Sequence, residues 1–172
     1  MNFYRKGVDI MAENINIKIT MQGGGEIELE LYPDVAPVTV ANFKKLVEEG
    51  FYNGLTFHRI IKGFMIQGGD PLGNGMGGSS EKIVGEFAIN GFNNTLRHTR
   101  GVISMARSQM PNSASSQFFI MHADAPHLDG SYAAFGKVVK GIEIVDEIAD
   151  TPVGFDGQTP KVTPVIESMV VL

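Results

Sequence analysis

The strongest constraint on the fold is a strict alternation of apolar and polar residues near the start of the chain. From Asn14 to Met21 isoleucines occupy every second position, and after Gly23–Gly25 apolar residues alternate with glutamates up to Leu31. Successive side chains of a β-strand point to opposite faces, so each of these strands has one apolar and one polar face. We therefore predict a β-hairpin over 14–31 that covers a core with one face only.

Short apolar runs separated by turn residues continue along the rest of the chain. We predict further strands on both sides of a bend at Lys62-Gly63 within Phe57–Asp70, and at Gly101–Ala106, Ser116–Met121, Ala133–Val139 and Lys161–Leu172. Helical spacing of apolar residues predicts one helix from Pro37 to a stop at Gly50 and a second over Gly141–Ala149. About eight strands with this spacing are typical of an all-β sandwich or barrel.

Composition excludes several classes of site. The chain of 172 residues has a net charge of −5, which argues against binding along a nucleic-acid backbone. It has no cysteine, so disulfides, thiol catalysis and cysteine-based zinc sites are excluded together. No apolar run approaches the ~20 residues of a membrane span, so we expect no membrane association.

The first residues do not follow the pattern of the rest. We expect residues 1–12 to form a flexible N-terminal extension and residues 13–172 to form one domain, since no linker or repeat interrupts them. The N-terminus lacks the apolar region of a secretory signal, so the expected location is the cytoplasm.

One stretch, Phe57–Asp70, combines a cation and an amide with large apolar side chains. Alternation puts Arg59 on the same face as Phe57, and Gln67 on the same face as Met65. Such a surface suits an uncharged, partly apolar ligand that carries amides, such as a peptide.

Simpler roles exist for the same residues. From the residues alone, a surface ion pair is the simpler role for Arg59, and the large apolar side chains suit an ordinary core as well as a pocket. Glutamines on strands are more often exposed to solvent than functional. The histidines and aspartates lack paired metal-ligand spacing, so we predict no metal site, and the glycine-rich segment after Asp70 is not followed by a phosphate-binding motif. We recognise no catalytic triad either.

A series of motifs in this order resembles the cyclophilin family of peptidyl-prolyl isomerases. The motifs are FHRIIKGFMIQGGD (57–70), NGMGG (74–78), GVISMA (101–106), SSQFFI (115–120), HLDG (127–130) and AFGKV (134–138). The resemblance extends over roughly residues 14–172. It implies a mainly β fold, a closed eight-stranded antiparallel barrel capped by two α-helices. It also implies an isomerase that rotates X–Pro peptide bonds in unfolded or flexible protein segments and so assists folding, without a cofactor and as a monomer.

The resemblance also implies roles for individual residues. Arg59 matches the catalytic arginine, and Phe64 and Gln67 complete the catalytic set. The implied substrate-binding residues are Met65, Gly75, Ala106, Arg107, Gln117, Phe119, His127, Leu128 and Tyr132. Alternation alone places Phe64 on the other face from Met65, so the bend at Gly63 is needed to bring both into one site.

The chain departs from the family pattern at the far wall of this site. His127 stands where many cyclophilins have a tryptophan that is tied to tight binding of cyclosporin, so we expect weakened affinity for such ligands. Tyr132 replaces a histidine, and one additional residue lies near Ser108–Met110. Two functions follow from the resemblance. One is an enzyme, which we favour because Arg59 and the pocket residues are present; the other is a non-catalytic module that binds proline peptides, or a chaperone, on the same barrel.

Overall fold

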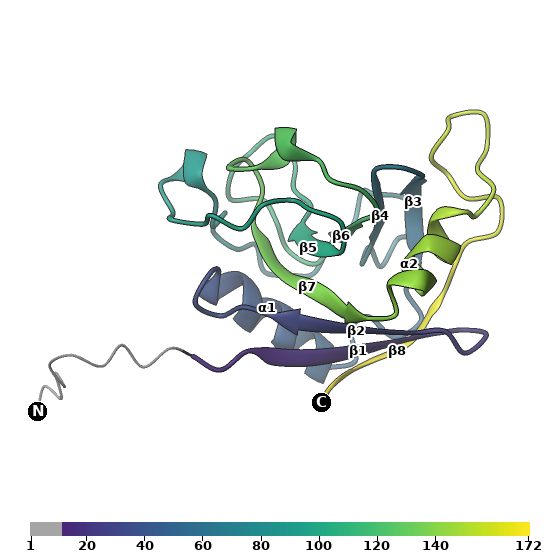
Figure 1. Cartoon of the computed structure of the whole chain (residues 1–172), viewed down its shortest axis with the longest axis horizontal. Coiled ribbons are helices and arrows are strands. Elements are labelled where there is room, and N and C mark those ends of the chain that lie inside the picture. The colour runs from purple at the N-terminus through teal and green to yellow at the C-terminus, as the bar shows by residue number, and fades with distance from the viewer. Residues whose placement is uncertain (1–11) are drawn as a thin grey trace, which may run out of the picture.

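The computed structural model describes residues 12–172, and over that range the chain forms eight strands and two α-helices (Figure 1). The predicted extension 1–12 lies, except for its last residue, outside the described residues. The strands are β1 Ile15–Met21, β2 Glu26–Leu31, β3 Phe57–Ile61, β4 Met65–Gly68, β5 Val102–Met105, β6 Phe118–Met121, β7 Ala134–Lys140 and β8 Ile166–Val171. The helices are α1 Pro37–Glu48 and α2 Ile142–Ala149, and short 3₁₀ turns occupy Ala88–Asn90 and Pro126–Leu128.

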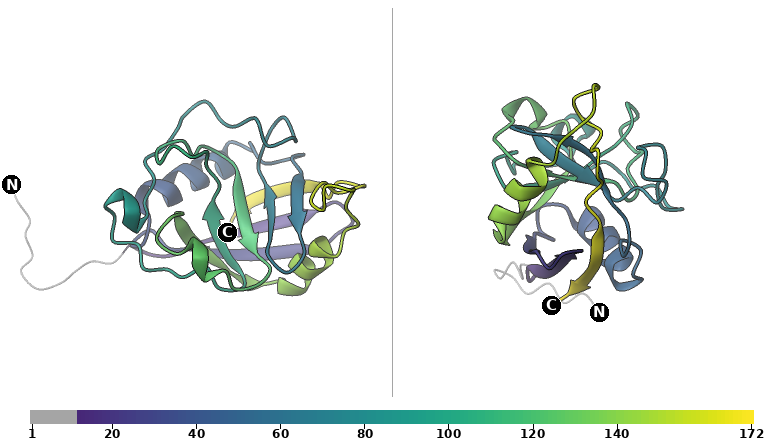
Figure 2. Two further views of the ribbon diagram at one scale, coloured as in Figure 1. Left: turned by 90° about the horizontal axis from the view of Figure 1, so that it is seen from above. Right: turned by 90° about the vertical axis from the view of Figure 1, so that its right-hand side faces the viewer.

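All eight strands belong to one antiparallel sheet in the order β3-β4-β6-β5-β7-β2-β1-β8. The sheet curls on itself, as the two further views in Figure 2 show. Its two outer strands meet just outside their ends, where Thr56 pairs with Val165 and the Phe57 N–H donates to the Pro164 carbonyl over 3.0 Å. The predicted mainly β, antiparallel barrel is therefore confirmed. The two helices lie at opposite ends of the molecule.

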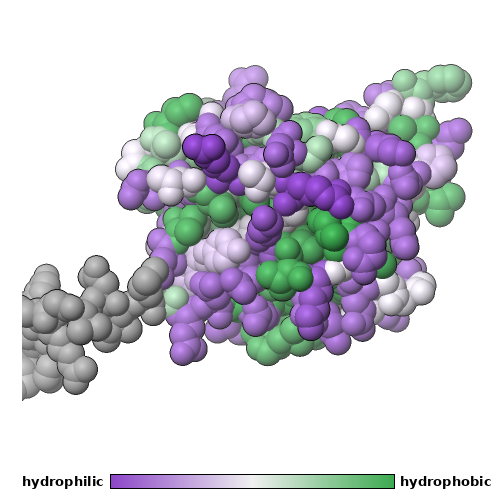
Figure 3. Space-filling model, viewed as in Figure 1, coloured by the Kyte–Doolittle hydropathy of each residue, from purple (hydrophilic) through white to green (hydrophobic). Residues whose placement is uncertain are grey.

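The predicted hairpin is confirmed in both its register and its burial. Ile17 pairs with Leu29 and Ile19 with Ile27, and all four side chains are fully buried. The polar face carries residues such as Glu26, and Figure 3 shows hydrophilic residues interspersed with apolar ones on the outside of the molecule. Alternation of apolar and polar residues was sufficient to predict this hairpin because one face of the sheet meets the core and the other meets solvent.

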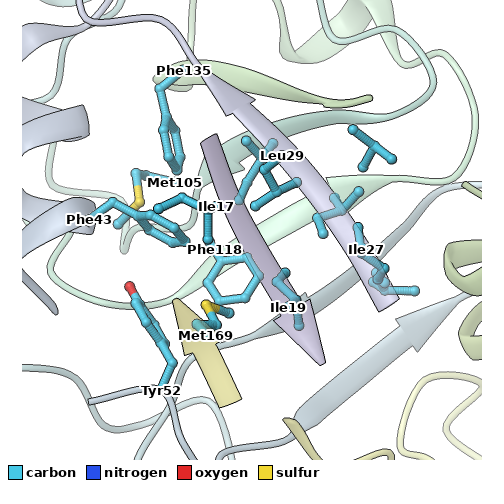
Figure 4. Packing of buried hydrophobic residues seen from close by; sticks show 14 of the residues in the cluster. Ile17, Ile19, Ile27, Leu29, Phe43, Tyr52, Met105, Phe118, Phe135 and Met169 are labelled. Carbon is cyan, nitrogen blue, oxygen red and sulfur yellow. The ribbon is translucent and has the colours of Figure 1, made fainter. Parts of the chain in front are cut away.

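An aromatic cluster fills the centre of the barrel (Figure 4). Phe43 of α1 lies 5.0 Å from Tyr52 and 5.5 Å from Phe118 of β6, measured between ring centroids. The Tyr52 hydroxyl donates to the Ser116 carbonyl over 2.9 Å, which satisfies its one polar atom in the core. The contact between Phe43 and Phe118 thus attaches helix α1 to the barrel beside β6.

Strand β3 departs from the predicted alternation. Phe57 pairs with Gly68 and Arg59 with Gln67, so His58 is the extra residue of a β-bulge. Because of the bulge, Phe57 is fully buried in the main core whereas Arg59 lies half-buried on the outer face. The prediction that these two side chains share a face is wrong, since alternation assumes a regular strand. Met65 and Gln67 do share a face of β4, as predicted.

Candidate active site

A small hollow with both apolar and polar lining lies on the outer face of β3, β4, β5 and β6. Its volume is about 140 Å³, and it is lined by Arg59, Phe64, Met65, Gln67, Ala106, Arg107, Phe119, Leu128 and Tyr132. A second hollow of about 330 Å³ adjoins it. The two share Gln67, Ala106 and Arg107, and the second one also contains Gly75 and Gln117. Together they form a groove that brings together eleven of the twelve residues that the sequence implied.

The twelfth residue, His127, lies at the rim of the first hollow. Its ring centroid is 5.7 Å from that of Phe64, and the two planes are tilted by 33°. Phe64 itself precedes β4 in the turn that contains Gly63, whose φ of +79° is accessible to glycine at little cost. The turn therefore directs Phe64 into the same hollow as Met65, as expected from the bend.

The floor of the first hollow is Phe119, which is 5 % exposed. It packs edge-to-face against Tyr132, with ring centroids 5.8 Å apart, and stacks on His98 at 6.0 Å. Phe119 belongs to a smaller apolar cluster outside the main core that also contains Met65 and Leu128. The hollow therefore has an apolar floor and wall, with the polar groups of Arg59, Gln67 and Arg107 at its other sides.

The guanidinium of Arg59 lies at the edge of the hollow and is held by two amide oxygens. Its Nη1 donates to Gln67 Oε1 over 3.3 Å, and its Nε donates to Gln158 Oε1 over 3.0 Å. Among residues 12–172, no carboxylate lies within ion-pair distance of it. The predicted alternative of a surface ion pair therefore finds no partner within residues 12–172, and no carboxylate of that range neutralises the guanidinium.

A chain of amides extends from Arg59 into the second hollow. Gln67 Nε2 donates to Gln117 Oε1 over 3.0 Å, and Gln117 Nε2 donates to the carbonyls of Gly75 and Gly77 over 3.0 and 2.7 Å. The glycine-rich loop is in turn folded around Asp70. Although burial of Asp70 favours its neutral form, hydrogen bonds from four backbone N–H groups outweigh this and lower the pKa of the carboxyl. The amide chain therefore rests on a fixed loop.

Arg107 has a different environment from Arg59. Its Nε and Nη2 both donate to the Ser131 carbonyl, over 3.1 and 2.6 Å, and its guanidinium lies 4.7 Å from the ring centroids of both Phe87 and Tyr132. Arg107 thereby fixes the wall of the hollow at Tyr132 by hydrogen bonds and cation–π contact. The neighbouring Ala106 N–H donates to the Gln117 carbonyl over 3.0 Å, so it is occupied by strand pairing.

A serine, a histidine and an aspartate that are joined by hydrogen bonds lie behind the hollow. His98 Nδ1 is 3.0 Å from Asp129 Oδ1, and His98 Nε2 is 2.9 Å from Ser104 Oγ. The sequence reading recognised no such triad. Ser104 and the His98 side chain are fully buried, so the hydroxyl cannot reach a substrate. Burial lowers the pKa of His98 despite the aspartate beside it. The set therefore supports Phe119 and the turn at 126–129 from behind.

The described residues offer no cluster of three or more potential metal ligands. They also include no helix that is long and apolar enough to cross a membrane. The groups that the groove offers to a ligand are the guanidinium of Arg59, the apolar side chains of the first hollow and the row of amides. Sequence reasoning missed Gln158, which lies in a loop 99 positions after Arg59 and belongs to no strand pattern.

Comparison with known proteins identifies the family of the chain. The family profile described as "Cyclophilin type peptidyl-prolyl cis-trans isomerase/CLD" matches residues 16–171. Peptidyl-prolyl cis-trans isomerase B of Bacillus subtilis is 47% identical over 130 residues, which cover 76% of this chain and 87% of the relative. Peptidyl-prolyl cis-trans isomerase-like 3 of Gallus gallus is 48% identical over 130 residues, or 75% of this chain and 79% of the relative.

A solved structure is similar over nearly the whole fold. A cyclophilin-type isomerase of Cryptosporidium parvum, crystallised in the presence of the dipeptide Ala-Pro, has a TM-score of 0.83 and 34% sequence identity. The match covers 91% of this chain and 98% of that one. The family profile, the curated relatives and the shared fold agree: the chain belongs to the cyclophilin-type peptidyl-prolyl cis-trans isomerase family.

Proposed function

We propose that the chain catalyses cis–trans isomerisation of X–Pro peptide bonds, with Arg59 as the catalytic group. The observation that carries the proposal is the guanidinium of Arg59, held by Gln67 and Gln158 beside a hollow of about 140 Å³ with an apolar floor. No covalent step and no cofactor are needed. The names of the relatives and the presence of Arg59 favour this enzyme over a module that only binds proline peptides.

The reaction requires stabilisation of a twisted amide. Rotation about an X–Pro bond has a barrier of roughly 18–20 kcal/mol because the twist removes the resonance of the amide. Once resonance is lost, the prolyl nitrogen carries a localised lone pair that can accept a hydrogen bond. Arginine is permanently charged and donates through a rigid fork, so it can bind that lone pair more strongly in the twisted state than in either planar state.

The hollow supplies the other part of the mechanism. Phe64, Met65, Phe119 and Leu128 surround the proline ring and exclude water, which strengthens the hydrogen bond from Arg59. Because the ring is held, rotation takes place about the peptide bond on its N-terminal side. The residues that precede the proline extend along the second hollow past Gln117 and Gly75.

The direct test is the rate of isomerisation of an X–Pro tetrapeptide by the wild-type protein and by Arg59→Ala. Loss of one preorganised donor from an oxyanion hole lowers kcat by about 10²–10³-fold, and we expect a decrease of that order here. Thermal unfolding controls for the fold, since Arg59 is only half-buried. A variant that isomerises the peptide at the wild-type rate would show that Arg59 is not the catalytic group.

Cyclosporin-type ligands test the rim of the same hollow. His127 lies beside Phe64 at the position where many cyclophilins carry a tryptophan, and a smaller ring buries less of a large apolar ligand. We propose that cyclosporin binds weakly and that His127→Trp binds it at least about tenfold more tightly, because the larger ring adds buried area. Titration calorimetry of the two proteins measures this, and equal affinities would rule out His127 as the cause.

A further inference from the structure

The loop between α2 and β8 reaches back to the groove. Gln158 in this loop accepts a hydrogen bond from Arg59 Nε over 3.0 Å, while Gln67 on the adjacent strand accepts one from Nη1 over 3.3 Å. The two acceptors come from segments far apart in the sequence and bind two different nitrogens of one planar group. A planar group that is bound at two of its three nitrogens can no longer rotate about its long axis. We propose that Gln158 is a positioning residue for catalysis, which acts by fixing the plane of the Arg59 guanidinium.

The loop is built so that the position of Gln158 is fixed. The Ile60 N–H donates to the Gln158 carbonyl over 2.8 Å, which joins the loop to β3 one residue beyond Arg59. Asp156 Oδ1 accepts the N–H groups of Gln158 and Thr159 over 3.0 and 2.9 Å. Gly157, between Asp156 and Gln158, has a φ of +75°, a left-handed conformation that suits glycine. The backbone therefore places Gln158 independently of its side chain, and the side chain is directed at Arg59.

The chemical type of the acceptor is also informative. Arg100 is held by the carboxylate of Asp146 at 2.6 and 2.8 Å, an ion pair that neutralises its charge. Arg59 is held by two amide oxygens, which orient the guanidinium without neutralising it. An uncompensated charge is what a developing lone pair on the prolyl nitrogen requires. The inference thus rests on the proposed function, and it adds a residue that the cyclophilin-like motifs of the sequence did not include.

Gln158→Met tests this inference because it keeps the length of the side chain and removes the acceptor. We expect kcat to fall about tenfold, which is the effect of losing one hydrogen bond to a charged group, and KM to stay within about twofold. Gln22→Met is the matched control, since Gln22 is an exposed glutamine on the β1–β2 turn, and it should behave as the wild type. The melting temperatures of all three proteins should agree, because the backbone hydrogen bonds of the loop are kept.

Two further measurements separate positioning from a structural role. If Gln158 acts through Arg59, the Gln158→Met substitution should cause no additional loss of activity in an Arg59→Ala background, so the two effects are not additive. The chain has five arginines, so the Nε–Hε resonance of Arg59 can be assigned from the spectrum of Arg59→Ala. In Gln158→Met this resonance should shift and broaden, whereas in Gln22→Met it should not move.

The outcomes distinguish this inference from the proposed function. If Arg59→Ala keeps the wild-type rate, the proposed mechanism fails, whatever Gln158 does. If Arg59→Ala is impaired but Gln158→Met keeps the wild-type kcat, the inference about Gln158 is overturned and the proposed function stands. Additive losses in the double variant would also overturn it, because they would show that Gln158 acts without Arg59.

Discussion

Replacing Arg59 by lysine separates the charge of the proposed catalytic group from its geometry. A guanidinium has five N–H donors in a rigid plane, and an ammonium has three on a single nitrogen. In this protein two of the five donors are used, by Gln67 and Gln158, so three remain for the substrate. A lysine ammonium that satisfied both amides would keep one donor, and its direction would not be fixed by a plane.

The expected effect lies between that of the wild type and that of full removal. We expect kcat/KM of Arg59→Lys to decrease about 30-fold, equivalent to about 2 kcal/mol of transition-state stabilisation. Full removal of one preorganised donor typically costs about 10²–10³-fold, so the order should be wild type, then lysine, then alanine. The difference between lysine and alanine measures the contribution of a charge without geometry.

The assay is isomerisation of an X–Pro tetrapeptide, followed by a protease that cleaves only the trans form or by exchange spectroscopy at equilibrium. The second method needs no protease and therefore controls for proteolysis of the variants. An Arg59→Lys rate equal to that of the wild type would refute the argument from geometry, since a point charge would then suffice. A rate equal to that of Arg59→Ala would refute the contribution assigned to charge.

Two further predictions concern the framework of the site. Glu86 is buried and accepts hydrogen bonds from the Thr39 N–H and hydroxyl at the start of α1. Glu86→Ala leaves these two buried donors unpaired, which should lower the free energy of unfolding by about 2–4 kcal/mol and Tm by roughly 5–12 °C in calorimetry. An unchanged Tm would contradict the capping role. Burial lowers the pKa of His98 below its usual 6.5, so as the pH falls the unfolded state takes up a proton at this histidine before the folded state does. The contribution of neutral His98 to the free energy of unfolding should therefore be fully present above pH 6.5 and should decrease as the pH falls below it. Urea unfolding at about pH 7.5 and about pH 5.5 measures this loss of stability, and the loss should be smaller in His98→Gln. An equal loss in the variant would assign the effect to other groups. One such group is His58, whose pKa is also lowered by burial.

The parts of the fold that sequence predicted well are those in which one local rule decides the structure. The hairpin follows alternation, since one face is buried and the other is wet. Helix α1 begins at Pro37 and ends before Gly50, whose φ of +71° is the left-handed stop that glycine permits. These rules act over a few residues and need no knowledge of the rest of the chain.

The departures arise where contacts distant in the sequence decide the structure. Because of the bulge at His58, Phe57 and Arg59 lie on different faces of the sheet. No local pattern in the five residues of β3 marks the position of this bulge. The Ser104–His98–Asp129 set was missed because its members lie on three separate segments. In both cases the packing of other strands, rather than local propensity, decides which way a side chain points.

The bulge and the loop at Gln158 together explain why Arg59 occupies the groove. A regular strand would place Arg59 on the same side as Phe57, which is fully buried in the barrel, where an unpaired guanidinium would be very costly. The extra residue of the bulge places Arg59 on the outer face instead. The hydrogen bond from the Ile60 N–H to the Gln158 carbonyl then fixes the strand immediately after the bulge. The same loop residue then orients the guanidinium through its side chain. The irregularity that alternation could not predict is thus what makes the proposed catalytic geometry possible.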